Sequence, residues 1–324
     1  MNFTSIREVA TRGDFPKLMD VGMKTSFFEA YKSVESEYEQ VVSFETSTKD
    51  KETYPSLSDV SFPEKVLEGE EYPEKGIGEM QDVDITNYKF GEIIGITREM
   101  VDDDQTKKIK MQPEKLGKAH RYFENKLVFS TIVAGTTAAT CYDGLAIFTT
   151  NHLNRKGGAA VAGNDNVYTS VTMSAGALIV ALDMINLWTG LDGGHIGVNA
   201  MKIICTPRLA YTARWLMSPT SGIPAYAANA LGPASNQAQT AGNNPLPLLG
   251  VLASKWLGKV GATALDWYIQ TDVPGWIFQV RDPLELYAQG NLSEDWFNRD
   301  VMKWKSRKRF GFKNIDWRAM MLIS

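Results

Sequence analysis

The segment VMKWKSRKRF, residues 301–310, alternates basic and non-basic side chains over most of its length. In an extended strand, neighbouring side chains point to opposite faces, and residues two apart share a face. One face of this strand therefore carries a row of cations about 6.8 Å apart, which we call the basic row: Lys303, Lys305, Arg307 and Arg309. Trp304 and Phe310 fall on the opposite face. The pattern predicts a strand whose cationic and aromatic side chains lie on opposite faces.

Helices and strands are mixed irregularly around this segment. Apolar spacing predicts helices over residues 17–40, 113–131, 174–188 and 207–217. Pro113 suits a first helical position, and Thr172 or Ser174 is expected to cap the third helix. Strands are predicted over residues 83–97, 201–206, 248–253, 265–270, 276–280, 296–310 and 315–322. Because the order shows no regular βαβ alternation, the predicted fold class is α+β.

Charge is unevenly distributed along the chain. Residues 29–104 contain 21 Asp/Glu and 7 Lys/Arg, a balance of 7 − 21 = −14, whereas residues 297–324 contain 8 Lys/Arg and 2 Asp/Glu, a balance of +6. Opposite patches on one molecule favour head-to-tail contacts between copies, because such contacts join different surfaces. The distribution therefore points to a building block rather than a catalyst.

The basic row allows three interpretations. It is either a solvated face, a partner for carboxylates of another subunit, or a contact for nucleic-acid phosphates. Among the functional interpretations we favour carboxylates, because the acid-rich stretch of the same chain is a ready counterpart. A nucleic-acid-binding protein remains the alternative, although the sequence contains no recognised binding module and the net charge is −4.

Three segments have little core-forming pattern. Residues 1–16 are expected to form a flexible arm. Residues 43–81 are rich in Glu, Lys, Ser, Gly and Pro, and their short alternating pieces at 41–46 and 65–67 suit a long hairpin whose order comes from a partner. Residues 218–244 carry no charge and are expected to form a long surface loop.

The sequence offers few groups for catalysis. The best cluster for a metal or acid–base site, and hence for a metal-dependent hydrolase using His152 and His195, is Asp143, His152, Asp192 and His195. Its spacing contains no His-x-x-x-His pair, and we expect His152 to be a loop histidine bonded to backbone. Cys141 and Cys205 have no basic or histidine neighbour in the sequence and are expected to be inert. We therefore predict no enzyme activity, no metal and no cofactor.

Membrane insertion and secretion are also not indicated. The longest apolar stretches, such as Leu178–Leu182, are far shorter than the roughly 20 residues of a membrane helix. The N-terminal residues MNFTSIREVATRGDF lack the apolar core of a signal peptide. We expect the protein to be made in the cytosol and to remain there or leave by lysis.

Several motifs occur in an order typical of one protein family. They are DGLAIFTTNHLNRKGG (143–158), SAGALIVALDMINLWTGLDGG (174–194), KIICTPRLAYTARWLM (202–217), NPLPLLGVLASKWL (244–257), IFQVRDPLELYAQ (277–289) and FNRDVMKWKSRKRFGFKNIDWRAMM (297–321). Upstream, NYKFGEIIGITREMVDDD (87–104) and PEKLGKAHRYFENKLVFSTI (113–132) fit the same order. From about residue 80 onward the chain resembles the major head subunit of Mu-like tailed phages, a branch of the HK97-fold capsid proteins.

The resemblance implies a domain plan and an assembly. The expected parts are an N-terminal arm and helix (1–42), an extended E-loop hairpin (43–90), a P domain with a long spine helix (91–135 and 280–324) and an A domain (136–279). Copies are expected to form the pentamers and hexamers of an icosahedral shell around double-stranded DNA, assembled in the host cytoplasm and present in the virion. A separate scaffold protein, a portal protein and non-specifically packaged DNA are the implied partners, with no membrane.

The E-loop and the basic row become the two candidate assembly surfaces. Candidate contact residues on the loop are Lys65, Glu68, Glu70, Glu71, Glu74 and Lys75. Some relatives crosslink a loop lysine to an asparagine, but no motif marks Lys65 or Lys75 for this reaction, and we predict none.

Overall fold

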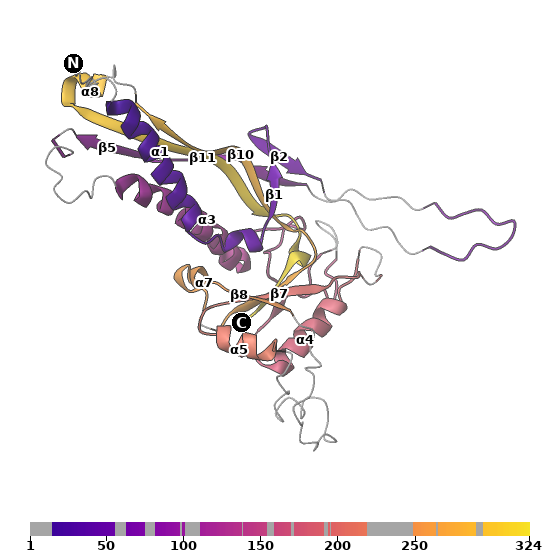
Figure 1. The fold of residues 1–324 in the computed structure, drawn as a ribbon. Helices are drawn as coiled ribbons and strands as arrows, with labels where there is room; N and C mark the ends of the chain where they lie inside the picture. Colours follow the sequence, from indigo (N-terminus) through magenta and orange to yellow (C-terminus); the bar gives the residue numbers. More distant parts are fainter. Residues whose placement is uncertain are drawn as a thin grey trace, which may run out of the picture. The chain divides into compact units, whose positions relative to one another are not determined.

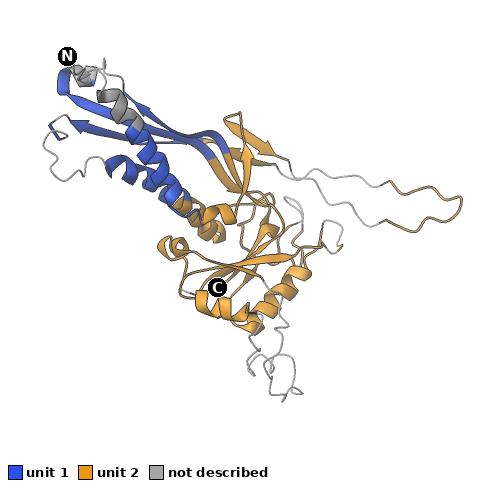
Figure 2. Cartoon of the chain, viewed as in Figure 1, with its two compact units in different colours: residues 1–36, 88–124, 280–310 blue, residues 37–87, 125–279, 311–324 orange. Residues whose placement is uncertain are grey.

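The basic segment lies in a strand of 14 residues, β11 (Val301–Asn314), of the computed structural model. The structure describes residues 15–55, 63–74, 82–97, 99–100, 111–137, 139–153, 159–169, 172–190, 194, 196–218, 249–263, 265–289 and 294–324. The chain forms two compact units (Figure 2), with boundaries inside the helix α3 and the strands β10 and β11. Unit 1 comprises residues 1–36, 88–124 and 280–310, and unit 2 comprises residues 37–87, 125–279 and 311–324.

Unit 1 combines long helices with strands that flank β11 (Figure 1). Its helices include α1 (Phe15–Ser33), the larger part of α3 (Gln112–Val133) and α8 (Glu294–Arg299). On one side β11 pairs antiparallel with β4 (Tyr88–Phe90) and β5 (Ile93–Thr97), and on the other side it neighbours β10 (Trp276–Ala288). The register with β5 places Trp304 opposite Ile94.

The core of unit 1 forms where α1 and α3 meet the inner face of these strands. Its buried members are Met23, Phe27, Ile96, Leu116, Leu286 and Trp304. The helices approach closely at Gly117, where an added Cβ would lie 2.3 Å from the carbonyl oxygen of Phe27. The Trp304 side of β11 thus forms part of the core.

Unit 2 is built on a second sheet in the order β6-β12-β9-β7-β8. The strands are β6 (Val167–Tyr168), β7 (Ala200–Cys205), β8 (Gly250–Ala253), β9 (Trp267–Thr271) and β12 (Met320–Ile323). Pairing is parallel for β12 with β6 and for β7 with β8, and antiparallel where β9 meets β12 and β7. The helices α4 (Ala175–Asn186), α5 (Ala210–Leu216) and α7 (Lys255–Lys259) accompany this sheet. Helices and strands alternate without a regular βαβ repeat, which confirms the predicted α+β class.

A hairpin projects from the same unit. Strand β2 (Lys51–Tyr54) pairs antiparallel with β3 (Val83–Thr86), and β1 (Ser43–Thr46) neighbours β10, where the ring of Phe44 packs 5.5 Å from that of Phe278. Between β2 and β3 the structure describes residues 63–74, which contain a turn with Gly69 at φ +86°. Residues 65–67 were expected to form part of a long hairpin but are not a strand. The observed pairing joins residues 51–54 to residues 83–86 instead.

Most predicted elements are present, with shifted ends. Ser174 caps α4 by accepting a hydrogen bond from the backbone of Ala177, as expected. The first predicted helix ends earlier, at Ser33, and is followed by the 3-10 helix η1 (Tyr38–Gln40). The last predicted strand is wrong at its start, because the 3-10 helix η5 (Trp317–Ala319) precedes β12. Of the predicted arm and surface loop, residues 1–14 and 219–244 lie outside the described residues.

Candidate assembly surface

The basic row lies on the outward face of β11. Burial alternates along the strand, with Trp304, Ser306, Lys308 and Phe310 buried and the residues between them partly or fully exposed. Lys305 is exposed, and about a third of the Lys303 and Arg307 side chains is accessible. The predicted separation of a cationic face from an aromatic face is therefore confirmed.

Neighbouring residues of the same unit already contact much of the row. The ammonium group of Lys303 lies 2.7 Å from a carboxylate oxygen of Asp295, and the guanidinium of Arg307 lies 2.7 Å from Asp282. The pKa of Asp295 is lowered by its hydrogen bond from Lys303. Lys305 instead lies over the ring of Tyr287, 5.5 Å from its centroid. The row is thus partly neutralised within the chain, and Lys305 is its most exposed cation.

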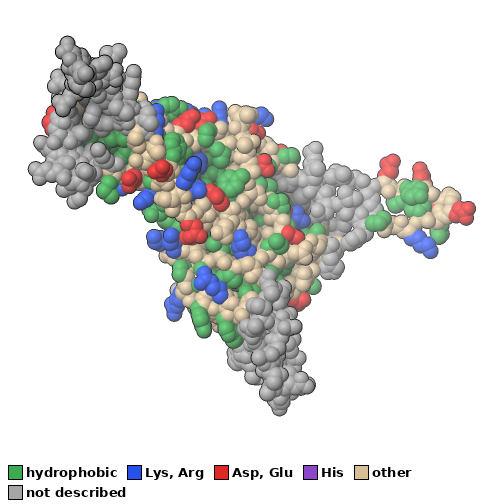
Figure 3. Space-filling view, viewed as in Figure 1, with side chains coloured by type: hydrophobic (Ala, Val, Ile, Leu, Met, Phe, Trp, Pro, Cys, Tyr) green, Lys and Arg blue, Asp and Glu red, His purple; other side chains and the backbone are tan. Residues whose placement is uncertain are grey.

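The acidic loop segment, residues 63–74, has the opposite character. Every residue in it is exposed except Val66, which is half-buried. It contains five Glu and one Lys, a balance of 1 − 5 = −4, and Figure 3 shows acidic side chains gathered on it. The turn is held locally, since the backbone N–H of Leu67 donates to the carboxylate of Glu70 at 3.2 Å. Lys65, Glu68, Glu70, Glu71 and Glu74 therefore face solvent, and Lys75 lies outside the described residues.

A buried polar network behind the row, between β11 and α3, was not predicted from the sequence. The ammonium of Lys308 lies 2.5 Å from Glu124 on α3, and the two side chains are 8% and 1% exposed. The hydroxyl of Tyr31 donates to Glu124 at 2.8 Å, and Arg121 donates to that hydroxyl at 3.1 Å. The sequence did contain a signal for burial of Lys308, because this lysine shares the strand face of Trp304 and Phe310.

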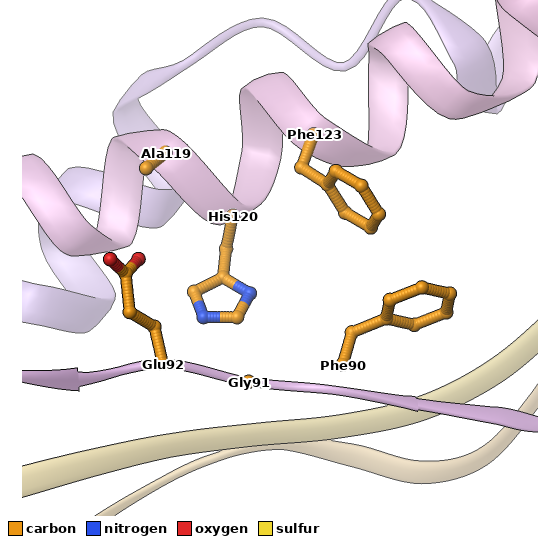
Figure 4. Close-up of a pocket in the computed structure, with 6 residues that line it drawn as sticks. All are labelled: Phe90, Gly91, Glu92, Ala119, His120 and Phe123. Atoms are coloured by element: carbon orange, nitrogen blue, oxygen red, sulfur yellow. The ribbon is translucent and has the colours of Figure 1, made fainter.

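A pocket of about 310 Å³ opens between α3 and the chain that links β4 to β5 (Figure 4). It is lined by Phe90, Gly91, Glu92, Ala119, His120 and Phe123. The rings of Phe90 and Phe123 lie 5.0 Å apart at one end, and Glu92 lies at the other. His120 stands between these ends and places its Nε2 atom 2.8 Å from the hydroxyl of Ser306.

The contacts of His152 in unit 2 differ from the expected hydrogen bonds to backbone. The ring is fully buried and bonds to side chains rather than backbone: Nδ1 lies 2.6 Å from Asp143, and Nε2 lies 3.0 Å from the amide oxygen of Asn166. It stacks on the indole of Trp317 at 4.3 Å and 3°. This arrangement is a packed polar core rather than a reaction site. Asp192 and His195 lie outside the described residues.

Other chemical features are few in the part of the chain that the structure describes. Cys141 and Cys205 are both buried, and burial raises the pKa of each thiol, which agrees with the inert role predicted for them. No group of three or more His, Cys, Asp or Glu side chains suited to a metal occurs among the described residues. The described helices include none with the length and apolar character needed to cross a membrane.

Comparison with known proteins gives the family. The family model described as "Phage capsid protein" matches residues 81–323. The chain belongs to this family. A comparison with curated proteins finds no match. This phage capsid protein is a structural component of the head shell, located in the virion, and not an enzyme.

Two solved structures with TM-scores of 0.50 and above support the fold of the capsid protein. It is similar to the capsid of a native GTA particle, with a TM-score of 0.55, 10% identity and 89% of each chain covered. It is also similar to a virus-like particle from Pyrococcus furiosus, with a TM-score of 0.50, 10% identity and coverage of 94% of this chain and 98% of that one. A procapsid of bacteriophage JBD30 matches at 17% identity and a TM-score of 0.49, over 95% of this chain and 74% of that one. The fold is the α+β HK97-like capsid fold, and capsid assembly implies self-association.

Proposed function

We propose that the chain is the major head subunit of a Mu-like tailed phage, forming the pentamers and hexamers of an icosahedral shell around double-stranded DNA. The observation that carries this proposal is the acidic loop segment. Residues 63–74 expose five carboxylates together with the apolar side chains of Leu67 and Tyr72, 56% and 81% accessible. A segment that buries so little surface in its own subunit gains its order from a neighbour.

The proposed domain plan follows the resemblance. The parts are an N-terminal arm and helix (1–42), an E-loop (43–90), a P domain (91–135 and 280–324) and an A domain (136–279). The antiparallel pairing of β2 with β3 supports an extended E-loop, because it brings residues 51–54 and 83–86 together at its base. Core packing of Trp304 with Leu116 supports joining the spine helix to the C-terminal strands.

The proposed contact joins the acidic loop segment of one subunit to the basic row of the next. Lys305 is the exposed cation of the row, and the four carboxylates Glu68, Glu70, Glu71 and Glu74 are its exposed counterparts. Each exposed ion pair contributes only about 0–1 kcal/mol, so the contact depends on repetition around the shell and on salt. Asp282 and Asp295 already pair with Arg307 and Lys303, so the row is not the continuous cationic track that would follow a phosphate backbone.

Further partners follow from the head-subunit role. A separate scaffold protein, a portal protein and packaged DNA bound without sequence preference are proposed. The mixed charge of the face shown in Figure 3, where blue and red side chains are interspersed, supports weak and non-specific contact with DNA rather than a continuous cationic patch.

Charge exchange tests the proposal. Glu68, Glu70, Glu71 and Glu74 are changed to Lys in one variant, and Lys303, Lys305, Arg307 and Arg309 are changed to Glu in a second. Each variant is coexpressed with its candidate scaffold and examined by negative-stain electron microscopy. We expect wild-type shells, few shells from either single set, and partial recovery of shells when the two sets are combined.

A control separates loss of assembly from loss of folding. Asp183, an exposed acid on α4, is changed to Lys and is expected to leave shell yield unchanged. Thermal unfolding of the loop variant should match that of the wild type, because its side chains contact no core. Wild-type protein that stays monomeric under every condition contradicts the proposed function, whereas normal shells from both charge variants contradict the charge contact.

A further inference from the structure

The pocket between α3 and the β4–β5 link has an aromatic end and a polar end. Phe90 and Phe123 form the aromatic end, and His120 and Glu92 form the polar end (Figure 4). Ala119 contributes only a methyl group at an exposed position, so nothing from α3 fills the space in front of it. A flat ring with one polar group is therefore the side chain that matches the lining.

Hydrogen bonding fixes which nitrogen of His120 faces a ligand. The hydroxyl of Ser306 donates its proton to the carbonyl of Glu92 at 3.1 Å and accepts from the N–H of the same residue at 3.2 Å. Nε2 of His120 lies 2.8 Å from the same hydroxyl, and with the Ser306 proton directed at Glu92 it is Nε2 that donates in this contact. Burial lowers the pKa of His120, which favours the neutral ring and leaves Nδ1 as an acceptor. In Figure 4 this nitrogen is on the side of Phe90 and Phe123.

Tyr72 matches this pocket in chemistry and in exposure. It is 81% accessible, which is unusual for a large aromatic side chain, and it stands in the acidic loop segment. Its ring matches the aromatic end, and its hydroxyl can donate a hydrogen bond to Nδ1 of His120. Leu67, the other large hydrophobic residue exposed in the segment, has no polar atom to offer.

Charge around the pocket also favours this segment. The exposed residues Lys115 and Lys118 stand within one helical turn of Ala119 on α3. Tyr72 is flanked by Glu70, Glu71 and Glu74, so its insertion brings carboxylates toward these lysines. Glu92 is the acidic residue that lines the pocket, and its single negative charge is outnumbered by the positive charges of the lysines.

We propose that Tyr72 of a second copy of this chain inserts into the pocket lined by Phe90, His120 and Phe123 and anchors the acidic loop segment there. This inference rests on the proposed function, because it names the residue that holds one subunit to the next. Buried aromatic anchors dominate many interfaces, while the exposed charges around them mainly guide approach. Tyr72 therefore contributes more to shell stability than any one ion pair of the basic row.

Two substitutions on opposite sides of the contact test this assignment. Tyr72→Ala removes the anchor, and Ala119→Phe fills the pocket from an exposed helix position. Full-length variants are coexpressed with the candidate scaffold, and the ratio of shells to free subunit is measured by gradient sedimentation. Each change is expected to lower that ratio about tenfold, the loss typical of an interface anchor. The double variant should be no worse than either single variant, since both remove the same contact.

Controls make failure of this inference distinguishable from failure of the proposed function. Met111→Phe adds a ring at another exposed position just before α3 and should assemble as the wild type does. Unfolding of each free subunit, followed by circular dichroism, should match that of the wild type. Wild-type ratios from Tyr72→Ala or Ala119→Phe, or an equal loss in Met111→Phe, overturn the anchor and leave the shell function standing. Absence of wild-type shells overturns both.

Discussion

Lys308 on β11 and Glu124 on α3 form a buried ion pair with 2.5 Å between Nζ and Oε1. The pair spans 184 residues of sequence and lies behind the exposed basic row. Tyr31 and Arg121 complete the hydrogen bonds of the carboxylate. The strand therefore carries two kinds of cation: outward ones suited to partners and an inward one that ties the strand to the helix.

Glu124→Gln is expected to lower the free energy of unfolding by about 3 kcal/mol, because Lys308 would keep its charge without a buried counter-charge. Urea unfolding of the free subunit measures this. Lys51→Met is the matched control, since Lys51 and Asp84 form an exposed pair, 53% and 42% accessible, whose loss costs less than about 1 kcal/mol. Equal losses in the two variants would contradict a special role for the buried pair.

Two helical glycines should respond oppositely to alanine. Gly117→Ala would press a methyl group against the carbonyl of Phe27, 2.3 Å away, and is expected to cost about 2–3 kcal/mol by separating α1 from α3. Gly22→Ala meets open space and is expected to stabilise α1 by about 0.5–1 kcal/mol. Thermal unfolding of both variants provides the comparison. A tolerated Gly117→Ala would mean that the helices do not cross there.

Asn166→Asp is expected to destabilise unit 2 by about 3 kcal/mol. The amide nitrogen of Asn166 donates to the carbonyls of Ile147, Trp317 and Met320 at 2.6, 3.2 and 3.3 Å. A carboxylate oxygen there would face three acceptors and leave them unpaired in the core. Urea unfolding checks the loss, with Asn298→Asp at an exposed helix position as a control expected within about 1 kcal/mol. A small effect at Asn166 would rule out this hydrogen-bond arrangement.

Low pH is expected to lower the stability of unit 1 through protonation of His120. Burial lowers the pKa of His120, and the charge of Lys308 lowers it further. The carboxylates of Glu124 and Glu92 act in the opposite direction. The unfolded chain, with an ordinary value of about 6.5, then binds more protons than the folded one, so stability falls as pH drops through and below that value. His120→Gln keeps a donor for Ser306 but cannot titrate, and its unfolding free energy should decline less between pH 7.5 and 5.5. Parallel profiles for variant and wild type would refute this origin of acid sensitivity.

Some differences from the predicted elements have clear local causes. Residues 296–299 were expected to begin a strand but belong to α8, near whose start Asp295 is a residue favourable for a helix N-terminus. The strand predicted to end at 280 continues to Ala288 as β10, through the exposed Pro283. Proline within a sequence usually signals the end of a strand, because it lacks the N–H of a ladder hydrogen bond.

The candidate sites differ in how far local pattern could predict them. The acidic loop segment was identifiable, since its composition offers no core face and its residues are indeed exposed. The bonding of His152 was not, because Asp143, Asn166 and Trp317 reach it from separate stretches of the chain. The pocket around His120 likewise needs β4 and α3 together.

Period-two alternation in residues 301–310 was sufficient to define a strand, its aromatic side and its cationic side, since side-chain direction in a strand is a local property of the backbone. Periodicity records which face is buried and carries no information about what lies across from it. The partners of the basic row, Asp282, Tyr287 and Asp295, and the partner of Lys308, Glu124, depended on packing between distant segments. Alternation points Lys305 and Lys308 to opposite faces, and packing against α3 supplies the buried counter-charge Glu124 that Lys308 needs.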